Sequence, residues 1–131
     1  MKISRSAGYG MVAVGYIAER EKEGAVLASR ISKEYDIPME YLLKILQQLV
    51  RAEILRSKRG PRGGFSMARG AKEINMLEII EAVSGPIRSH MELVQQTGGA
   101  SFAKKMEKVI DDATVKAEAV LSKARLSDML S

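Results

Sequence analysis

Apolar residues recur at helical spacing along most of the chain, with glycine and proline at the interruptions. The segment 4–23 places Tyr9, Val12 and Ile17 on a helical pattern that ends at Gly24. Three glycines lie inside this segment, and each weakens an isolated helix by about 1 kcal/mol relative to alanine. We therefore expect this helix to depend on tertiary contacts, and its small residues to let another element approach closely.

Two shorter helical patterns follow, over residues 27–35 and 38–51, with only Asp36 and Ile37 between them. So brief a break between two helices predicts a helix-turn-helix. Pro38 suits the first turn of the second helix, where a missing N–H leaves nothing unsatisfied. The apolar residues of that helix follow the i, i+3, i+4, i+7 rule and are expected to face the core: Leu42, Ile45, Leu46 and Leu49.

The segments 54–57 and 65–68 flank a Gly/Pro-rich turn and predict a two-stranded hairpin. A hairpin this small is marginal alone and must pack on the helices. After it, Asn75 is expected to cap a helix that runs to about Val83, with Leu77 and Ile80 facing inward beside Val83. The sequence Ser-Gly-Pro at 84–86 ends that helix.

A polar connector over residues 87–100 precedes a long helical pattern from Phe102 to about Lys123. Its apolar residues step by four and three, which suits packing of one helix on another. This helix either folds back on its own domain or protrudes as a dimerisation helix. We favour protrusion, because the preceding elements already form a compact unit. The predicted dimerisation residues are Phe102, Met106, Val109, Ala113, Ala117 and Val120.

Composition narrows the range of functions. The chain has 131 residues, a net charge of +5, one histidine and no cysteine. The lack of cysteine excludes disulfides and thiolate-bound metal clusters, and His90 with Glu92 is interpreted as a surface pair rather than a metal site. No Ser/His/Asp arrangement or phosphate-binding loop is present, so we expect neither an enzyme nor a cofactor. Neither a membrane helix nor a secretory signal is apparent, which favours a cytoplasmic protein.

Positive charge is concentrated in residues 51–72, which contain seven Lys or Arg residues and a single acid, Glu53. The turn within "SKRGPRGGFSMAR" needs glycine and proline for its shape but does not need arginine. A basic hairpin beside a helix-turn-helix can enter the DNA minor groove while the helix occupies the major groove. Lys58, Arg59 and Arg62 are the candidates on the hairpin. The alternative is a solvated basic loop that serves solubility.

The helix over residues 38–51 supplies the other candidates. Lys44 can donate to guanine or phosphate, and Gln48 can pair with adenine. Each could equally belong to an ordinary solvated helix face. The remaining predicted DNA-binding residues are Glu40, Tyr41 and Arg51 on this helix, and Ser4, Arg5 and Arg30 as phosphate contacts.

Five stretches resemble the Rrf2 family of winged-helix transcriptional regulators, which includes the IscR, NsrR and CymR types. They are "MKIS", Tyr9-Gly10, "IPMEYLLKILQQLVRAEIL", "RSKRGPRGGFSMAR" and "INMLEIIEAVSGPI". The resemblance covers about residues 1–88, and the closing "ARLSDML" is similar to the family's end. The Arg59-Gly60-Pro61-x-Gly63-Gly64-Phe65 wing is its most specific part.

This resemblance implies a mainly α fold with a small β-hairpin wing. It divides the chain into a winged helix-turn-helix DNA-binding domain (1–86), a connector (87–101), and a dimerisation helix with its closing motif (102–131). It also implies a homodimer that binds a pseudo-palindromic promoter site on double-stranded DNA, and we expect a repressor. The helix from Pro38 would be the recognition helix, and Arg59 the minor-groove residue of the wing.

Many family members hold an iron–sulphur cluster with three cysteines before the dimerisation helix. Residues 84–101 contain none here, so we predict that the cluster is absent, as in the CymR type, which acts with a protein partner. A protein or small-molecule effector is therefore expected. Two alternatives remain open: a basic RNA-binding domain, and a partner-binding adaptor on a winged-helix scaffold.

Overall fold

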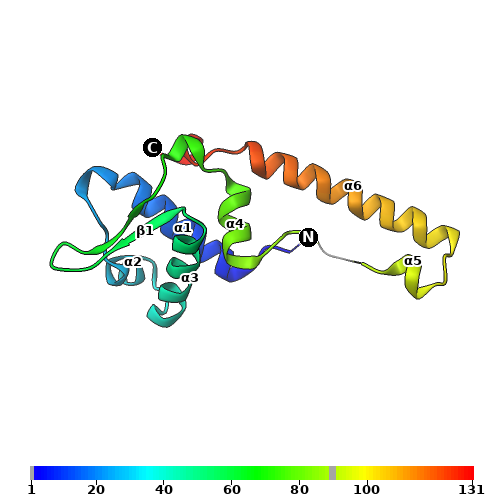
Figure 1. Ribbon diagram of the computed structural model, residues 1–131, viewed down its shortest axis with the longest axis horizontal. Helices are drawn as coiled ribbons and strands as arrows, with labels where there is room; N and C mark the ends of the chain where they lie inside the picture. The colour runs from blue at the N-terminus through cyan, green and yellow to red at the C-terminus, as the bar shows by residue number, and fades with distance from the viewer. Residues whose placement is uncertain (1, 89–90) are drawn as a thin grey trace.

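A computed structural model describes residues 2–88 and 91–131 of the chain. Helices α1–α4 and a β-hairpin pack together at one end, and α6 extends from them as a long arm that carries α5 near its far end (Figure 1). The predicted fold class, mainly α with a small hairpin, is confirmed. The elements are α1 (Arg5–Glu19), η1 (Glu21–Glu23), α2 (Ala28–Tyr35), α3 (Met39–Arg51), β1 (Leu55–Lys58), β2 (Gly64–Met67), η2 (Ala71–Glu73), α4 (Met76–Ser84), α5 (Leu93–Gln96), α6 (Ser101–Lys123) and α7 (Leu126–Met129).

The core forms where α1, α2, α3 and α4 meet. Leu42, Leu46 and Leu49 of α3 are fully buried, as their spacing predicts. The close approach expected of the α1 glycines occurs at Gly10, where a Cβ atom would lie 3.0 Å from Cγ2 of Val83 on α4. The lack of a side chain at Gly10 therefore lets α1 pack closely on α4, which also contacts α3.

The helix-turn-helix is formed by α2 and α3. Asp36 ends α2 in the left-handed conformation (φ 52°), and Ile37 then turns its side chain into the core. Pro38 directly precedes the first helical residue of α3, one position earlier than expected. Because Ile37 is buried at the turn, the angle between the two helices is fixed by packing as well as by the short connection.

The hairpin begins one residue later than predicted in its first strand and one residue earlier in its second. It is antiparallel, with Leu55 opposite Met67. A third extended segment, absent from the sequence prediction, pairs with it: the backbone N–H groups of Val26 and Phe65 donate to each other's carbonyl oxygens at 2.8 Å. Because only one residue of this segment is paired, there is no alternation of apolar and polar residues from which the pairing could have been predicted. It fastens the hairpin to the start of α2.

The helix predicted from Asn75 is present as α4. The Asn75 side chain accepts from the Glu78 N–H, and the Glu78 carboxylate accepts from the Asn75 N–H, which completes a capping box. Ile79 and Ile80 are the buried residues of this helix, whereas Leu77 and Val83 are only half-buried. The inward face is therefore rotated slightly from the predicted one.

The end of the chain returns to the N-terminal unit. Leu126 at the start of α7 is buried in the core, and its N–H donates to the Ile74 carbonyl at 2.8 Å.

The short helix α5 was not predicted; it packs against α6, and its Val94 N–H donates to the Glu107 carboxylate. Helix α6 thus packs on the domain at one end and projects from it at the other, combining the two alternatives for the long helix. Among the described residues, no helix is both long and apolar enough to cross a bilayer.

Candidate nucleic-acid interface

A groove of about 600 Å³ separates the third helix from the hairpin. One wall is the outer surface of α3, the other is the hairpin, and the start of α2 closes the end between them. A groove between a recognition helix and a wing lets one element enter the major groove of DNA while the other reaches the adjacent minor groove. Its lining residues are Leu27, Ala28, Ser29, Met39, Gln47, Val50, Arg51, Ser57, Lys58, Arg59, Gly64 and Phe65.

The hairpin presents Lys58, Arg59 and Arg62 to solvent. All three are exposed, and none takes part in an ion pair with another described residue. The turn between the strands is held by a hydrogen bond from the Gly63 N–H to the Gly60 carbonyl at 2.9 Å. A Cβ atom on Gly63 would lie 2.5 Å from the Lys58 carbonyl oxygen, so only glycine fits there. The glycines therefore set the shape that holds the cations outward.

Arg69, a cation of the same basic stretch, has a different environment. Its Nε donates to the Glu53 carbonyl at 3.0 Å and its Nη1 to the Glu73 carbonyl at 3.3 Å. Its Nη2 forms a 2.8 Å ion pair with Oε1 of Glu78, the partner of Asn75 in the capping box of α4. Arg69 therefore joins the base of the hairpin to α4, and its charge is satisfied within the protein.

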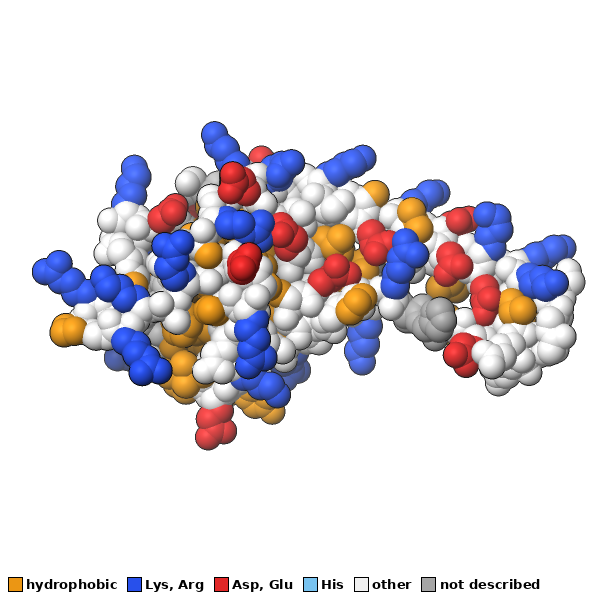
Figure 2. Space-filling model, in the orientation of Figure 1, with side chains coloured by type: hydrophobic (Ala, Val, Ile, Leu, Met, Phe, Trp, Pro, Cys, Tyr) orange, Lys and Arg blue, Asp and Glu red, His pale blue; other side chains and the backbone are white. Residues whose placement is uncertain are grey.

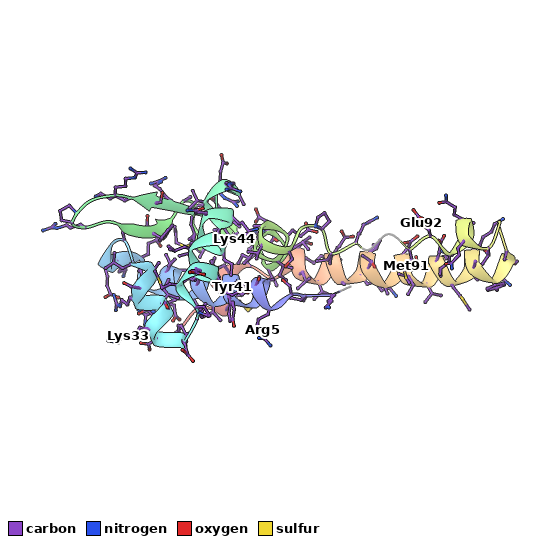
Figure 3. The ribbon with its side chains drawn as sticks, turned by 90° about the horizontal axis from the view of Figure 1, so that it is seen from below. Arg5, Lys33, Tyr41, Lys44, Met91 and Glu92 are labelled. Carbon is purple, nitrogen blue, oxygen red and sulfur yellow. The ribbon has the colours of Figure 1, made fainter. Side chains whose placement is uncertain are left out.

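The outer surface of α3 is polar and open. Tyr41 and Lys44 lie near each other on this helix, with Lys33 on α2 and Arg5 on α1 nearby (Figure 3), and all four are exposed. Glu40 and Arg51 are also exposed. Polar and cationic side chains make many of the hydrogen bonds between proteins and the phosphates of DNA.

Gln48 was predicted to read a base, but the structure turns it away from this open surface. Its side chain is half-buried, and Nε2 donates to the Val83 carbonyl of α4 at 3.4 Å. One residue earlier, Gln47 is exposed and lines the groove. Gln47 shares a face with Lys44 and Arg51 at helical spacing, a signal that the sequence contained and that the prediction missed.

The predicted phosphate contacts differ in availability. The Ser4 hydroxyl caps α1 by accepting from the Ala7 N–H at 3.1 Å and hydrogen-bonds to the Ser84 hydroxyl at 2.5 Å. Arg5, the first residue of α1, is exposed. Arg30 is half-exposed, 3.8 Å from a Glu23 carboxylate oxygen, with its guanidinium 5.6 Å from the centre of the Tyr16 ring. Arg5 and Arg30 thus offer accessible charge, whereas the Ser4 hydroxyl is already engaged.

Ser29 and Met39 also line the groove, although the sequence did not single them out. Ser29 lies near the start of α2, and it reaches the groove because the bridge between Val26 and Phe65 brings this segment to the hairpin. A contact of this kind depends on tertiary structure alone.

Figure 2 shows the wider distribution of charge, with Lys and Arg projecting from the hairpin end and many Asp and Glu side chains over the middle of the molecule and the arm.

The arm carries a second exposed surface, which is apolar. Phe102, Met106, Val109 and Val120 are 59%, 54%, 66% and 68% exposed, and Ala113 between them is exposed as well. Ala117 differs from this set, since it is half-buried against the small cluster of Ala7, Ile80 and Ile87. The exposed five are named the α6 stripe below. Large apolar side chains repeated along one helix face are typical of a surface that another helix covers.

A helix-turn-helix, a cationic hairpin fixed to it and an open groove between them define a winged-helix DNA-binding protein. The sequence profile of the Rrf2 family, described as iron-dependent transcriptional regulator, matches residues 3–131. The transcriptional regulator IscR of Cereibacter sphaeroides is 32% identical over 99% of this chain and 87% of its own length.

Solved structures agree with the sequence comparisons. CymR, the global cysteine regulator of B. subtilis, superposes with a TM-score of 0.81 at 25% identity, over 98% of this chain and 95% of its own. IscR of T. potens superposes with a TM-score of 0.69 at 26% identity, over 98% and 85%. The chain belongs to the Rrf2 family and is a DNA-binding transcriptional regulator, not an enzyme.

The family's description names an iron dependence, but the residues present do not fit an iron–sulphur cluster. The chain contains no cysteine, so no thiolate is available as a ligand. The part of the chain that the structure describes holds no group of three or more His, Asp or Glu side chains able to bind a metal ion. His90, half of the pair considered above, lies outside the described residues.

Proposed function

We propose that this protein is a homodimeric repressor that binds a pseudo-palindromic promoter site and acts without an iron–sulphur cluster. One observation carries the proposal: the exposed hairpin cations Lys58, Arg59 and Arg62, which form no ion pair with another described residue, lie beside the open surface of α3. Exposed cations next to an open groove favour a polyanion with a regular surface. A DNA duplex has both properties.

In this proposal, α3 lies in the major groove, and the hairpin enters the neighbouring minor groove. Glu40, Tyr41 and Lys44 face base edges and nearby phosphates. The accessible cations Arg5, Arg30 and Arg51 neutralise phosphates, while Ser4 orients α1 and Gln48 holds α3 against α4. The minor-groove contacts are Lys58, Arg59 and Arg62.

The homodimer is supported by the α6 stripe. Its side chains project from the arm, and apolar surface repeated at helical spacing is most simply covered by the same stripe of a second copy. Pairing two arms would place two winged helices on one duplex, which is the arrangement that a pseudo-palindromic site requires. Residues 1–86 then form the DNA-binding unit and 102–131 the dimerisation element, with α7 tied back to the first unit.

The regulatory signal is proposed to come from a protein or small-molecule effector rather than a cluster. The connector, residues 87–101, joins α4 to the arm and contains α5, which packs on α6. An effector bound there would act on both the dimer and the base of α4. This position makes the connector the first region to test once an effector is found.

Substitution of Arg59 tests the DNA interface. Genomic fragments bound by the wild-type protein are first selected, and affinity for the best fragment is then measured by fluorescence anisotropy over a range of salt concentrations. Arg59→Ala is expected to lose about 1–3 kcal/mol of binding free energy and to flatten the salt dependence. Lys108→Ala is the matched control, because it removes one exposed cation from the arm, distant from the hairpin.

Equal binding by the wild type and Arg59→Ala would show that the hairpin does not contact DNA. A preference for structured RNA over duplex DNA in competition would support the RNA-binding alternative. Failure to enrich any genomic fragment would instead favour a partner-binding adaptor.

A further inference from the structure

Glu40 is an exposed acid in the first turn of α3, on the helix face proposed to meet DNA. The exposed cations Lys44 and Arg51 lie further along that face, and Arg59 lies across the groove. None of the ion pairs among the described residues involves Glu40, although Lys44 follows it at the i+4 position. Its carboxylate is therefore available to a ligand.

An ordinary role for this residue is helix stabilisation. An acid in the first turn interacts favourably with the unpaired N–H groups at a helix N-terminus. Helix α3 has no side-chain cap, because Pro38 precedes it. This role accounts for an acid at position 40, but it predicts no effect on which DNA sequence is bound.

A carboxylate on a DNA-facing surface is otherwise unfavourable, since it lies near phosphates and must shed water on binding. The cost is offset only where the carboxylate meets a donor. The N-terminal residues of a recognition helix are the ones that contact base edges. Glu40 occupies that end of α3, so the donor it meets would belong to a base.

In the major groove, only the exocyclic amines of cytosine and adenine donate hydrogen bonds. The adenine amine lies beside the N7 acceptor, which repels a carboxylate, while guanine and thymine present acceptors there. Cytosine N4 is the remaining partner. Resting on the proposed placement of α3 in the major groove, we propose that Glu40 accepts a hydrogen bond from a cytosine N4 amine in each half-site. Repulsion from the acceptors of other bases excludes them.

Selection from a randomised pool of DNA duplexes tests this assignment, because the bound duplexes themselves reveal the preferred bases. The full-length wild type, Glu40→Gln and the control Glu21→Gln are each carried through the same selection. The control removes an exposed acid from η1, outside the helix-turn-helix. The wild type is expected to prefer C·G at one position of each half-site by about tenfold. Glu40→Gln should change that position alone to A·T, because an amide both accepts from N6 and donates to N7 of adenine.

Thermal unfolding of the same variants separates the two roles of Glu40. A lower midpoint for Glu40→Gln together with an unchanged motif would assign the residue to helix stabilisation and overturn the inference. Enrichment of one identical motif by all three proteins would do the same. If the wild type enriches no motif at all, the proposed DNA-binding function itself fails, and the inference fails with it.

Discussion

Helices α3 and α6 have the same kind of apolar pattern but opposite environments. In α3, Leu42 and Leu46 are fully buried within the chain's own core. In α6, Phe102 and Val109 are more than half exposed. Spacing by three and four marks which face of a helix is apolar, but it does not say whether the covering surface belongs to the same chain.

The two ends of α6 also differ in their environments, although they belong to one helix. Ala117 and Leu121 pack on α4 and α1, whereas the other half extends beyond the domain with α5 against it (Figure 1). An intramolecular face and the exposed stripe thus lie on different sides of one helix. If the α6 stripe is a dimer surface, substitutions in α3 and α6 should affect different equilibria: unfolding of the subunit in the first case and association in the second.

The largest expected effect is on folding, from Leu46→Ala in α3. Removing a fully buried leucine side chain leaves a cavity, and the free energy of unfolding is expected to fall by about 2–5 kcal/mol. Chemical denaturation followed by circular dichroism measures this loss. The control, Val109→Ala, removes a comparable apolar group from the exposed stripe. If both variants lost the same stability at a protein concentration where the chain is monomeric, the distinction between the two helices would be wrong.

Val109→Glu in α6 should act on association instead. Two copies of the stripe brought together would place the new carboxylates in an apolar interface, and the dimer dissociation constant is expected to rise about 100-fold. Sedimentation velocity over a concentration series measures this change. Val115→Glu is the matched control, since Val115 is exposed on α6 but does not belong to the stripe. Unchanged association of Val109→Glu, with Val115→Glu dissociating, would move the interface to the other side of the arm.

Much of this fold follows from local sequence rules. The helix-turn-helix, the capped start of α4 and the long helix were each predicted within about two residues, because periodic apolar positions, Asn75 and the Gly85 stop act locally. The bridge between Val26 and Phe65 was not predictable, since it joins segments distant in the chain through a single residue pair.

The candidate site was predicted less completely, for a physical reason. Sequence identifies which side chains can bind DNA, but tertiary contacts decide which remain available. Arg69 and Gln48 carry suitable groups that the fold uses internally, through Glu78 and the Val83 carbonyl. By contrast, the turn that exposes Arg59 is determined locally by its glycines, so the hairpin was the most predictable part of the site.

The smallest expected effect is on the stability of the subunit, from substitution of two α1 glycines, Gly8 and Gly10, by alanine. These variants compare a packed and an open face within a third helix. At Gly10 a new Cβ atom would lie 3.0 Å from Val83, and that crowding should cancel the gain in helix propensity or exceed it. A Cβ atom added at Gly8 would have no described atom beyond its own helix backbone and chain neighbours within 4 Å, so Gly8→Ala should raise the free energy of unfolding by about 0.5–1 kcal/mol. Thermal unfolding at low protein concentration compares the two variants. Because Gly8 is on the open side of α1, a loss of dimer affinity in Gly8→Ala would place the partner on that side, whereas an unchanged affinity is expected if the dimer contact is the α6 stripe.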